Sequence, residues 1–289
     1  MKFGMREVAD VMVKTRVANQ KVGGQVIPAK GTPICHFDSL KTSSLEQAAS
    51  TVYAQGGRGN SRLVAWEGDK TLTLTMEDAL ISKAGLALLT GANLIDISLD
   101  KNVQETIVHV TEICEVKEEN KIGLSNTPAE GQPVFYAPVD DTGTVIGAFK
   151  TLENNTVAAG LDAVLVDYYV KKDKTSSVLL VDIEEAAFGG NFYFEGSTLW
   201  RDGDGRDYPA EFIIPNGHIQ SNFTFAMSST GDPSTFTFTV DAFPGTTVYN
   251  KKKRVLAAMQ IIDETTENVT SDSTWLDLGT TSPAQTGEE

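Results

Sequence analysis

The chain has 289 residues, with 24 Lys and Arg against 39 Asp and Glu, and therefore a formal net charge of −15. This acidity disfavours tight binding to the phosphate backbone of DNA, which needs clustered basic residues. Because 40% of the residues are hydrophobic and only 22% are charged, the chain can bury a core and does not have the composition of a disordered protein.

The N-terminal segment and the two cysteines indicate where in the cell the protein is made. The chain soon meets Arg6, Glu7 and Asp10, so it lacks the apolar stretch of a signal peptide, and it contains no run of about 18 apolar residues. We therefore expect synthesis in the cytoplasm and no membrane anchor. Cys35 and Cys114 are far apart and form no CxxC pair, which predicts two reduced, buried thiols rather than a disulfide or a zinc site.

Residues 39–59 form a polar tract rich in Ser, Thr, Gln and Gly, after a weakly patterned stretch over residues 1–30. The tract ends in Gly56-Gly57-Arg58-Gly59, whose glycines lack the GxGxxG or GxxxxGK[ST] spacing of a nucleotide site. Long polar segments inside a compact domain are usually functional or disordered. We therefore expect a flexible loop over residues 39–59.

A strand and then a helix are expected next. Residues 71–76 alternate Thr with Leu or Met, the pattern of a half-buried strand. The sequence from Thr75 to Asp78 fits a helix-capping signal, Leu80 and Ala84 follow at helical spacing, and Gly91 supplies a stop. These signals predict one α-helix over residues 77–90, with an apolar stripe packed on the sheets.

The rest of the chain is dominated by short strands separated by turn residues. Residues 222–227 and 235–240 both alternate Phe with polar residues, and the turn-rich segment 228–234 joins them, which predicts a β-hairpin. Strands at this spacing favour a mainly β fold of two packed antiparallel sheets, a sandwich or barrel-like arrangement, rather than a βαβ sheet. The other expected strands are residues 106–116, 134–137, 164–170, 178–183, 190–199, 210–214 and 255–262.

No residue pattern indicates catalysis or a cofactor. His36, His109 and His218 stand far apart without an HExxH motif, and no GxSxG or comparable nucleophile motif is present. We expect His109 to be an ordinary strand residue. The sequence therefore predicts no catalytic and no cofactor-binding residues.

Two charged runs invite other interpretations. Asp202-Gly203-Asp204-Gly205 resembles the start of a calcium loop, but the positions that should hold the later ligands carry Arg206, Asp207 and Ile213, so a tight turn is favoured and no metal site is predicted. Residues 251–254, Lys-Lys-Lys-Arg, are interpreted as a solvated turn; a contact between subunits stays open as an alternative.

Two stretches resemble the major tail tube proteins of tailed bacteriophages. In residues 58–80, a turn containing Trp66 and Gly68 precedes a Thr-alternating strand and the Asp78-Ala79-Leu80 run, which in this family begins a helix. Residues 194–205 and 212–215, with Gly231-Asp232-Pro233, resemble the C-terminal strands of the same family. Together the matching stretches cover about half of the chain, and the resemblance does not extend to residues 118–183.

The resemblance implies a structural virion protein. It implies two packed sheets with a flanking helix, six copies closing into a ring, and rings stacking into the tube through which the genome is ejected. The implied partners are other copies of the chain, the tape measure protein, the tail terminator and, in a contractile tail, the sheath. DNA would pass through the lumen without specific binding, because acidic walls repel a polyanion.

From the resemblance we expect two β regions and two interface segments. Residues 1–117 and 184–279 are expected to form the tail-tube β-sandwich domain, residues 118–183 an inserted or added β region, and residues 280–289 a flexible polar tail. The 39–59 loop and the 223–240 hairpin are expected at subunit interfaces. Deleting residues 42–57 should then leave a folded monomer that cannot polymerise.

Two other functions stay open from the sequence. One is another virion structural role, as a tail terminator, capsid-associated or decoration protein. The other is a carbohydrate-binding β-sandwich module, because Trp66, Trp200 and Trp275 are residues that can stack on sugar rings. An enzyme is disfavoured because no acid–base or nucleophile arrangement is found.

Overall fold

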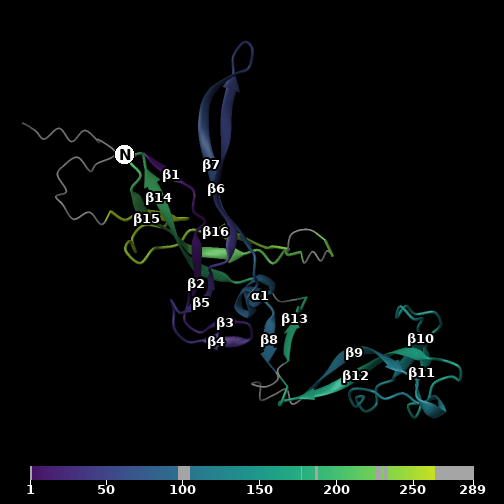
Figure 1. Ribbon diagram of the computed structural model, residues 1–289. Helices are drawn as coiled ribbons and strands as arrows, with labels where there is room; N and C mark the ends of the chain where they lie inside the picture. The colour runs from purple at the N-terminus through teal and green to yellow at the C-terminus, as the bar shows by residue number, and fades with distance from the viewer. Residues whose placement is uncertain are drawn as a thin grey trace, which may run out of the picture. The chain divides into compact units, whose positions relative to one another are not determined.

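The computed structural model describes residues 2–96, 105–176, 178–185, 188–224, 229–230 and 234–263 (Figure 1). Contacts divide the chain into two compact units. Unit 1 comprises residues 1–93 and 183–289, and unit 2 comprises residues 94–182. Residues 280–289, expected as a polar tail, lie outside the described residues.

Unit 1 is built on one nine-stranded antiparallel sheet. Its strands follow the order β5-β2-β14-β15-β16-β7-β6, while β1 pairs with β14 and β17 pairs with β15. A short separate hairpin joins β3 and β4. The strands are β1 (Phe3–Met5), β2 (Asp10–Thr15), β3 (Gln20–Val22), β4 (Gln25–Ile27), β5 (Pro33–Phe37), β6 (Leu40–Gly56), β7 (Ser61–Asp78), β14 (Asn191–Asp202), β15 (Asp207–Ile219), β16 (Phe236–Ala242) and β17 (Ala258–Ile261).

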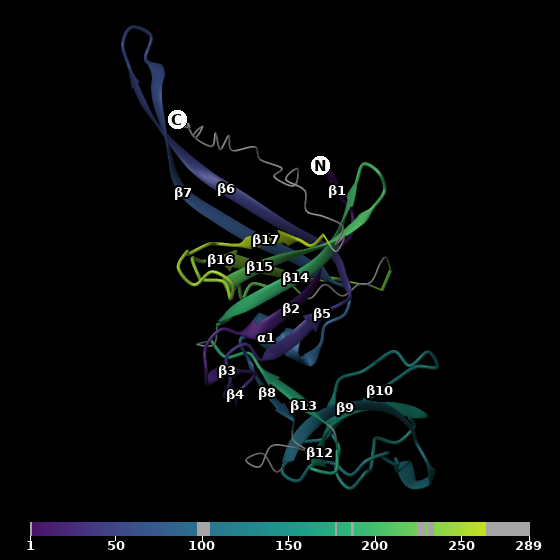
Figure 2. The same ribbon diagram turned by 90° about the vertical axis from the view of Figure 1, so that its left-hand side faces the viewer.

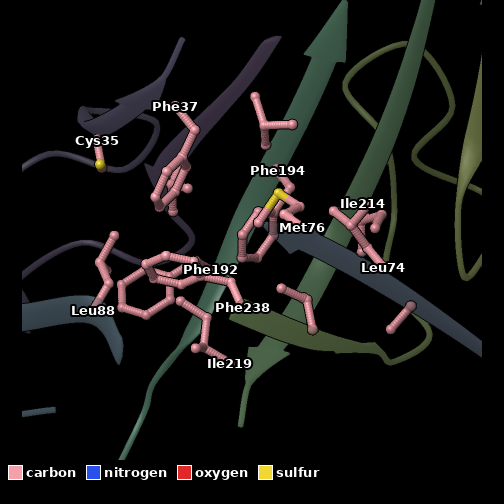
Figure 3. Packing of buried hydrophobic residues seen from close by; sticks show 14 of the residues in the cluster. Cys35, Phe37, Leu74, Met76, Leu88, Phe192, Phe194, Ile214, Ile219 and Phe238 are labelled. Carbon is pink, nitrogen blue, oxygen red and sulfur yellow. The ribbon is translucent and has the colours of Figure 1, made fainter. Parts of the chain in front are cut away.

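The core of unit 1 lies on one face of this sheet. Leu72, Leu74 and Met76 of β7 are buried at every second position, as the alternation predicts. Figure 3 shows Met76 gathered with Phe194 and other buried side chains, several of them aromatic. The expected mainly β fold with several antiparallel sheets is confirmed, and the described strands close no barrel.

The single α-helix of the described residues, α1 (Lys83–Thr90), begins later than predicted. Glu77 and Asp78 belong to β7 instead, because their backbone pairs with β16 on one side and β6 on the other. The cap is Ser82, whose Oγ accepts a hydrogen bond from the Gly85 backbone N–H at 2.9 Å. The predicted stop is confirmed: Gly91 ends the helix at φ 66°.

The prediction of a loop over residues 39–59 is wrong, because residues 40–56 form strand β6. This strand pairs with β7 from Leu40 to Gly56. The turn between them uses Gly57, Gly59 and Asn60, all at positive φ. The polar tract hides its strand character because side chains on both faces of its outer part are solvent-exposed.

The hairpin expected over residues 222–240 is described only in part. The second strand is confirmed as β16, but residues 222–224 are not in a strand, and residues 225–228 and 231–233 lie outside the described part. The two neighbours of β16 are β15 and β7. Strand β15 pairs only with the end of β16, from Val240 to Ala242, so the described residues do not test the partner strand expected over residues 222–227.

Unit 2 has its own sheet and its own core. The sheet order is β11-β10-β12-β9, and a second, two-stranded sheet pairs β8 with β13. Its buried cluster includes Tyr168, Val164 and Val166 of β12, with Cys114 of β9. The elements are β8 (Asn93–Asp96), β9 (Glu105–Glu115), the 3₁₀ turn η1 (Glu118–Asn120), β10 (Phe135–Pro138), β11 (Lys150–Thr151), β12 (Ala163–Asp173) and β13 (Leu179–Asp182).

Strand β9 pairs with β12 along its whole length, which places residues 105–115 within unit 2. The sequence predicts these residues in the domain that begins with residues 1–117. The expected strand itself is confirmed, as are the strands expected over residues 134–137, 164–170, 178–183, 190–199, 210–214 and 255–262.

Candidate assembly interface

The outer part of the β6–β7 hairpin, residues 49–70, is here called the arm. Strand β16 pairs only with residues 73–78 of β7, so the arm is a two-stranded ribbon. Figures 1 and 2 show it projecting beyond the other strands of unit 1. Residues 61–71 of β7 are all exposed, and burial begins at Leu72. The arm therefore contributes no residue to the buried core of unit 1.

The arm exposes large apolar side chains. Val52 pairs with Trp66, and Ala54 pairs with Val64, so these side chains share one face of the ribbon. Trp66 is 55% exposed, Val52 63% and Leu63 67%. An isolated two-stranded hairpin is marginally stable in water, and clustered exposed apolar residues mark an interaction surface. The arm thus has the properties of a segment that is covered by another protein.

The edges of the unit 1 sheet offer a second contact surface. Within the described residues, β5 and β6 end the strand order, so each has one edge without a strand neighbour. Open edges carry unpaired backbone N–H and C=O groups that pair readily with strands of another chain. A subunit with two such edges can extend its sheet into copies on either side.

The predicted interface segments fall in different places. Most of the 39–59 tract lies in β6 and contributes one strand of the arm. The 223–240 segment contributes β16, which stands between β15 and β7 in the strand order. Leu63, Val64 and Trp66 of β7 complete the arm and lie outside the predicted segments. Their signal in the sequence is the Gly57–Asn60 turn signature with a strand-forming run on each side.

The three tryptophans form no common sugar-binding platform in the described structure. Trp66 lies on the arm, whereas Trp200 of β14 packs beside Phe3 with ring centroids 5.8 Å apart. Trp275 lies outside the described residues. The Trp66–Gly68 segment, read as a turn in the family resemblance, is part of β7.

The Asp202–Gly205 segment is a tight turn between β14 and β15, as predicted. The Asp202 Oδ1 accepts hydrogen bonds from the backbone N–H groups of Asp204 and Arg206, each at 2.9 Å. The hydrogen bond from the Arg206 backbone is the main cause that lowers the pKa of Asp202. The described residues contain no cluster of three His, Cys, Asp or Glu side chains suited to a metal ion.

The histidines and cysteines occupy separate strands. His109 lies on β9 beside Asp167, as an ordinary strand residue, while His218 on β15 contacts Asn191 through Nδ1 at 2.8 Å. Cys35 and Cys114 are free and buried, as predicted. Burial raises the pKa of both thiols, which keeps them protonated at neutral pH.

A mainly β subunit with an exposed apolar arm and open sheet edges defines a class of structural proteins that assemble through strands. The family model described as the YomU/Tube protein family matches residues 25–257. The chain therefore belongs to this family of phage tail tube proteins, which makes it a component of the virion that assembles with itself and with other tail proteins. No curated protein matches the chain. In the described part of the chain, no helix has the length and apolar character needed to cross a membrane.

Proposed function

We propose that this chain is a major tail tube protein, six copies of which close into a ring, and that the rings stack into a tube for genome ejection. The observation that carries this proposal is the arm, a ribbon that exposes Val52, Val64 and Trp66 on one face. Side chains of this size gain about 1.5–3 kcal/mol each when a neighbour covers them completely. The arm is therefore the segment with most to gain from contact with a second copy.

Ring closure is assigned to the free sheet edges. Strand β6 of one copy and β5 of the next end the sheet on opposite sides, which is the arrangement that a head-to-tail ring requires. Closing the ring leaves no edge to aggregate. The arm then reaches beyond its own subunit, and the six-fold symmetry is taken from the family resemblance.

The charge of the chain supports passage of DNA rather than binding. Six copies of a chain at −15 carry a formal charge of roughly −90 per ring. A surface of this sign repels phosphate groups, so DNA would move along the lumen without specific contacts. The remaining partners in this proposal are the tape measure protein, the tail terminator and, in a contractile tail, the sheath. The chain has a structural and not an enzymatic role in this proposal.

Negative-stain electron microscopy of the concentrated protein tests the proposal. We expect hollow tubes with six-fold symmetry in averaged end views. A variant with Val52→Ser, Val64→Ser and Trp66→Ser should keep its circular dichroism spectrum, because these side chains are exposed, and should form no tubes. Monomers of the unmodified protein that never assemble would refute the proposed function.

A matched control separates the arm from exposed apolar residues in general. Ile107 and Ile113 of β9 are 47% and 54% exposed, close to the values for the arm residues. Replacing both with Ser should leave tube formation unchanged. Equal loss of tubes in the control and in the arm variant would show that the arm has no special role.

A further inference from the structure

Unit 1 carries a basic surface that the proposed function leaves unused. We call residues 243–254, which include Phe243, Val248, Tyr249 and the run Lys251–Arg254, the basic patch. Val248 is 74% exposed and Tyr249 58%, and all four basic residues are exposed. Within the described chain, none of these four side chains forms an ion pair. The patch thus combines positive charge and apolar surface without a described acidic partner.

A shallow pocket of about 350 Å³ adjoins the patch. It is lined by Asn191, Asn216, His218, Phe243, Pro244 and Arg254. Asn216 Oδ1 has no contact with solvent and no hydrogen-bond partner, while Arg254 donates to the Pro244 carbonyl oxygen at 3.2 Å. The pocket therefore places the exposed Arg254 guanidinium within reach of a polar chain segment, above a buried acceptor that has no partner.

The residues after β17 have the complementary composition. Residues 264–289, here called the C-terminal segment, contain no Lys or Arg. Their six acidic residues are Glu264, Glu267, Asp272, Asp277, Glu288 and Glu289. Trp275, Leu276 and Leu278 stand among them, so the segment pairs negative charge with apolar groups. The negative charge of the segment is thus opposite to the positive charge of the basic patch, and both contain apolar side chains.

The basic patch and the start of the C-terminal segment lie at opposite ends of β17. Near the patch, Gly245 bridges Val255, and β17 begins opposite Ile213. At the other end the Ile262 backbone N–H donates to the Pro209 carbonyl oxygen at 2.8 Å, and the chain leaves the sheet there. The eight residues of β15 from Pro209 to Asn216 span about 24 Å, whereas 26 residues reach up to about 85 Å when extended.

Opposite placement of a docking surface and its ligand on one subunit produces head-to-tail assembly. The chain leaves β17 while running away from its own patch, so it would have to reverse to reach it. A second copy displaced along the strand direction presents its patch ahead of the segment. We propose that the C-terminal segment of one copy docks on the basic patch of a neighbouring copy; this inference rests on the proposed tube.

Zero-length cross-linking of assembled tubes tests the docking. Tubes are grown from an equal mixture of ¹⁴N- and ¹⁵N-labelled full-length protein, and a carbodiimide joins carboxylates to lysines in contact. Mass spectrometry should find Lys251, Lys252 or Lys253 joined to carboxylates of residues 264–289, with both isotopes in one cross-linked pair. Lys171, Lys172 and Lys174 of unit 2, a basic cluster of similar size, should give no such pairs.

A second measurement uses salt. Tubes of the variant Lys251→Glu, Lys252→Glu, Lys253→Glu should dissociate at a salt concentration lower by about twofold, because docking depends on opposite charges. The same reversal at Lys171, Lys172 and Lys174 should have no effect. Cross-linked pairs that carry one isotope only would mean docking within a copy and would overturn this inference. The absence of cross-links to the patch would overturn it too. Neither result would contradict the proposed tube. Protein that forms no tubes would overturn the proposed function as well.

Discussion

Close packing inside unit 1 depends on Gly217 of β15. A Cβ at this position would lie 2.6 Å from a ring carbon of Phe194 and 2.6 Å from a methyl carbon of Val240. Both neighbours are completely buried, so neither can move aside without disturbing the core. We expect Gly217→Ala to lower the free energy of unfolding by about 1–3 kcal/mol, measured by urea denaturation.

The control for this substitution is Gly203→Ala in the β14–β15 turn. A Cβ there meets no atom within 4 Å, and its backbone is not at positive φ. The free energy of unfolding should therefore stay within about 0.5 kcal/mol of the unmodified protein. Equal effects at both positions would mean that β15 is packed less tightly than the structure shows.

The Glu112 side chain ties β9 to the loop after it in unit 2. It accepts hydrogen bonds from Tyr168 Oη at 2.7 Å and from the Ser125 backbone N–H at 2.9 Å. Burial raises the pKa of Glu112, but the hydrogen bonds from Ser125 and Tyr168 outweigh it and lower the pKa below the usual 4.5. The charged form is therefore favoured in the folded state.

This lowered pKa predicts a pH dependence with a definite sign. A carboxylate with a lowered folded-state pKa stabilises above its unfolded pKa, and the contribution disappears as the pH falls through the folded value. Glu112→Gln should therefore cost about 1 kcal/mol at pH 7 and less at pH 3. Urea unfolding of both proteins at the two pH values measures this. A cost that is the same at both would show that the charge of Glu112 has no part in it.

Deleting the arm tests its role better than deleting residues 42–57, because it leaves the core of unit 1 complete. That deletion would also take away the β6 residues paired with the buried part of β7, including Leu45, which packs on the core. Ala49 pairs with Lys70, so residues 50–69 can be replaced by an Asn-Gly turn that keeps the base of the hairpin. We expect a monomer with an unchanged thermal transition that forms no tubes.

Size-exclusion chromatography and electron microscopy measure this outcome. Tubes of normal length from the shortened protein would remove the arm from the assembly interface. Loss of the folded monomer would show instead that the arm stabilises unit 1, which its exposed side chains argue against.

The sequence predicted strands well where one face is buried. Leu72, Leu74 and Met76 alternate with Thr because β7 has a core side and a solvent side there. The arm was missed because it has no core side, so its residues lack the alternation that marks a strand. The helix start was misplaced because Asp78 resembles a helix-capping residue, whereas pairing with β6 and β16 keeps it in a strand. Local signals cannot report such tertiary pairing.

The candidate interface was likewise predicted only in part, because its contacts depend on how strands pair. The sequence placed one strand of the arm at an interface through the polar composition of residues 39–59. It could not place Trp66 beside Val52, since that contact depends on the register of two strands and a bulge between Ala49 and Thr51. Free edges likewise follow from the strand order, which a list of strands does not contain.

The two units have separate cores, and this predicts that they can be separated. The unit 1 cluster contains only residues from before Asn93 and after Ile183, and the unit 2 cluster contains only residues between Cys114 and Val170. β8 and β13 are hydrogen-bonded neighbours, so a short Gly-Ser-Gly link from Asp96 to Leu179 can replace residues 97–178. Unit 1 should then fold and still form tubes, because the arm and the sheet edges are retained.

The tubes of this shortened protein should be narrower if unit 2 is an added region that faces outward. Electron microscopy measures the diameter, and urea unfolding followed by circular dichroism measures whether unit 1 keeps its stability. Tubes of unchanged diameter would mean that unit 2 does not lie on the outer surface. A shortened protein that does not fold would mean that unit 1 depends on unit 2 despite its separate core.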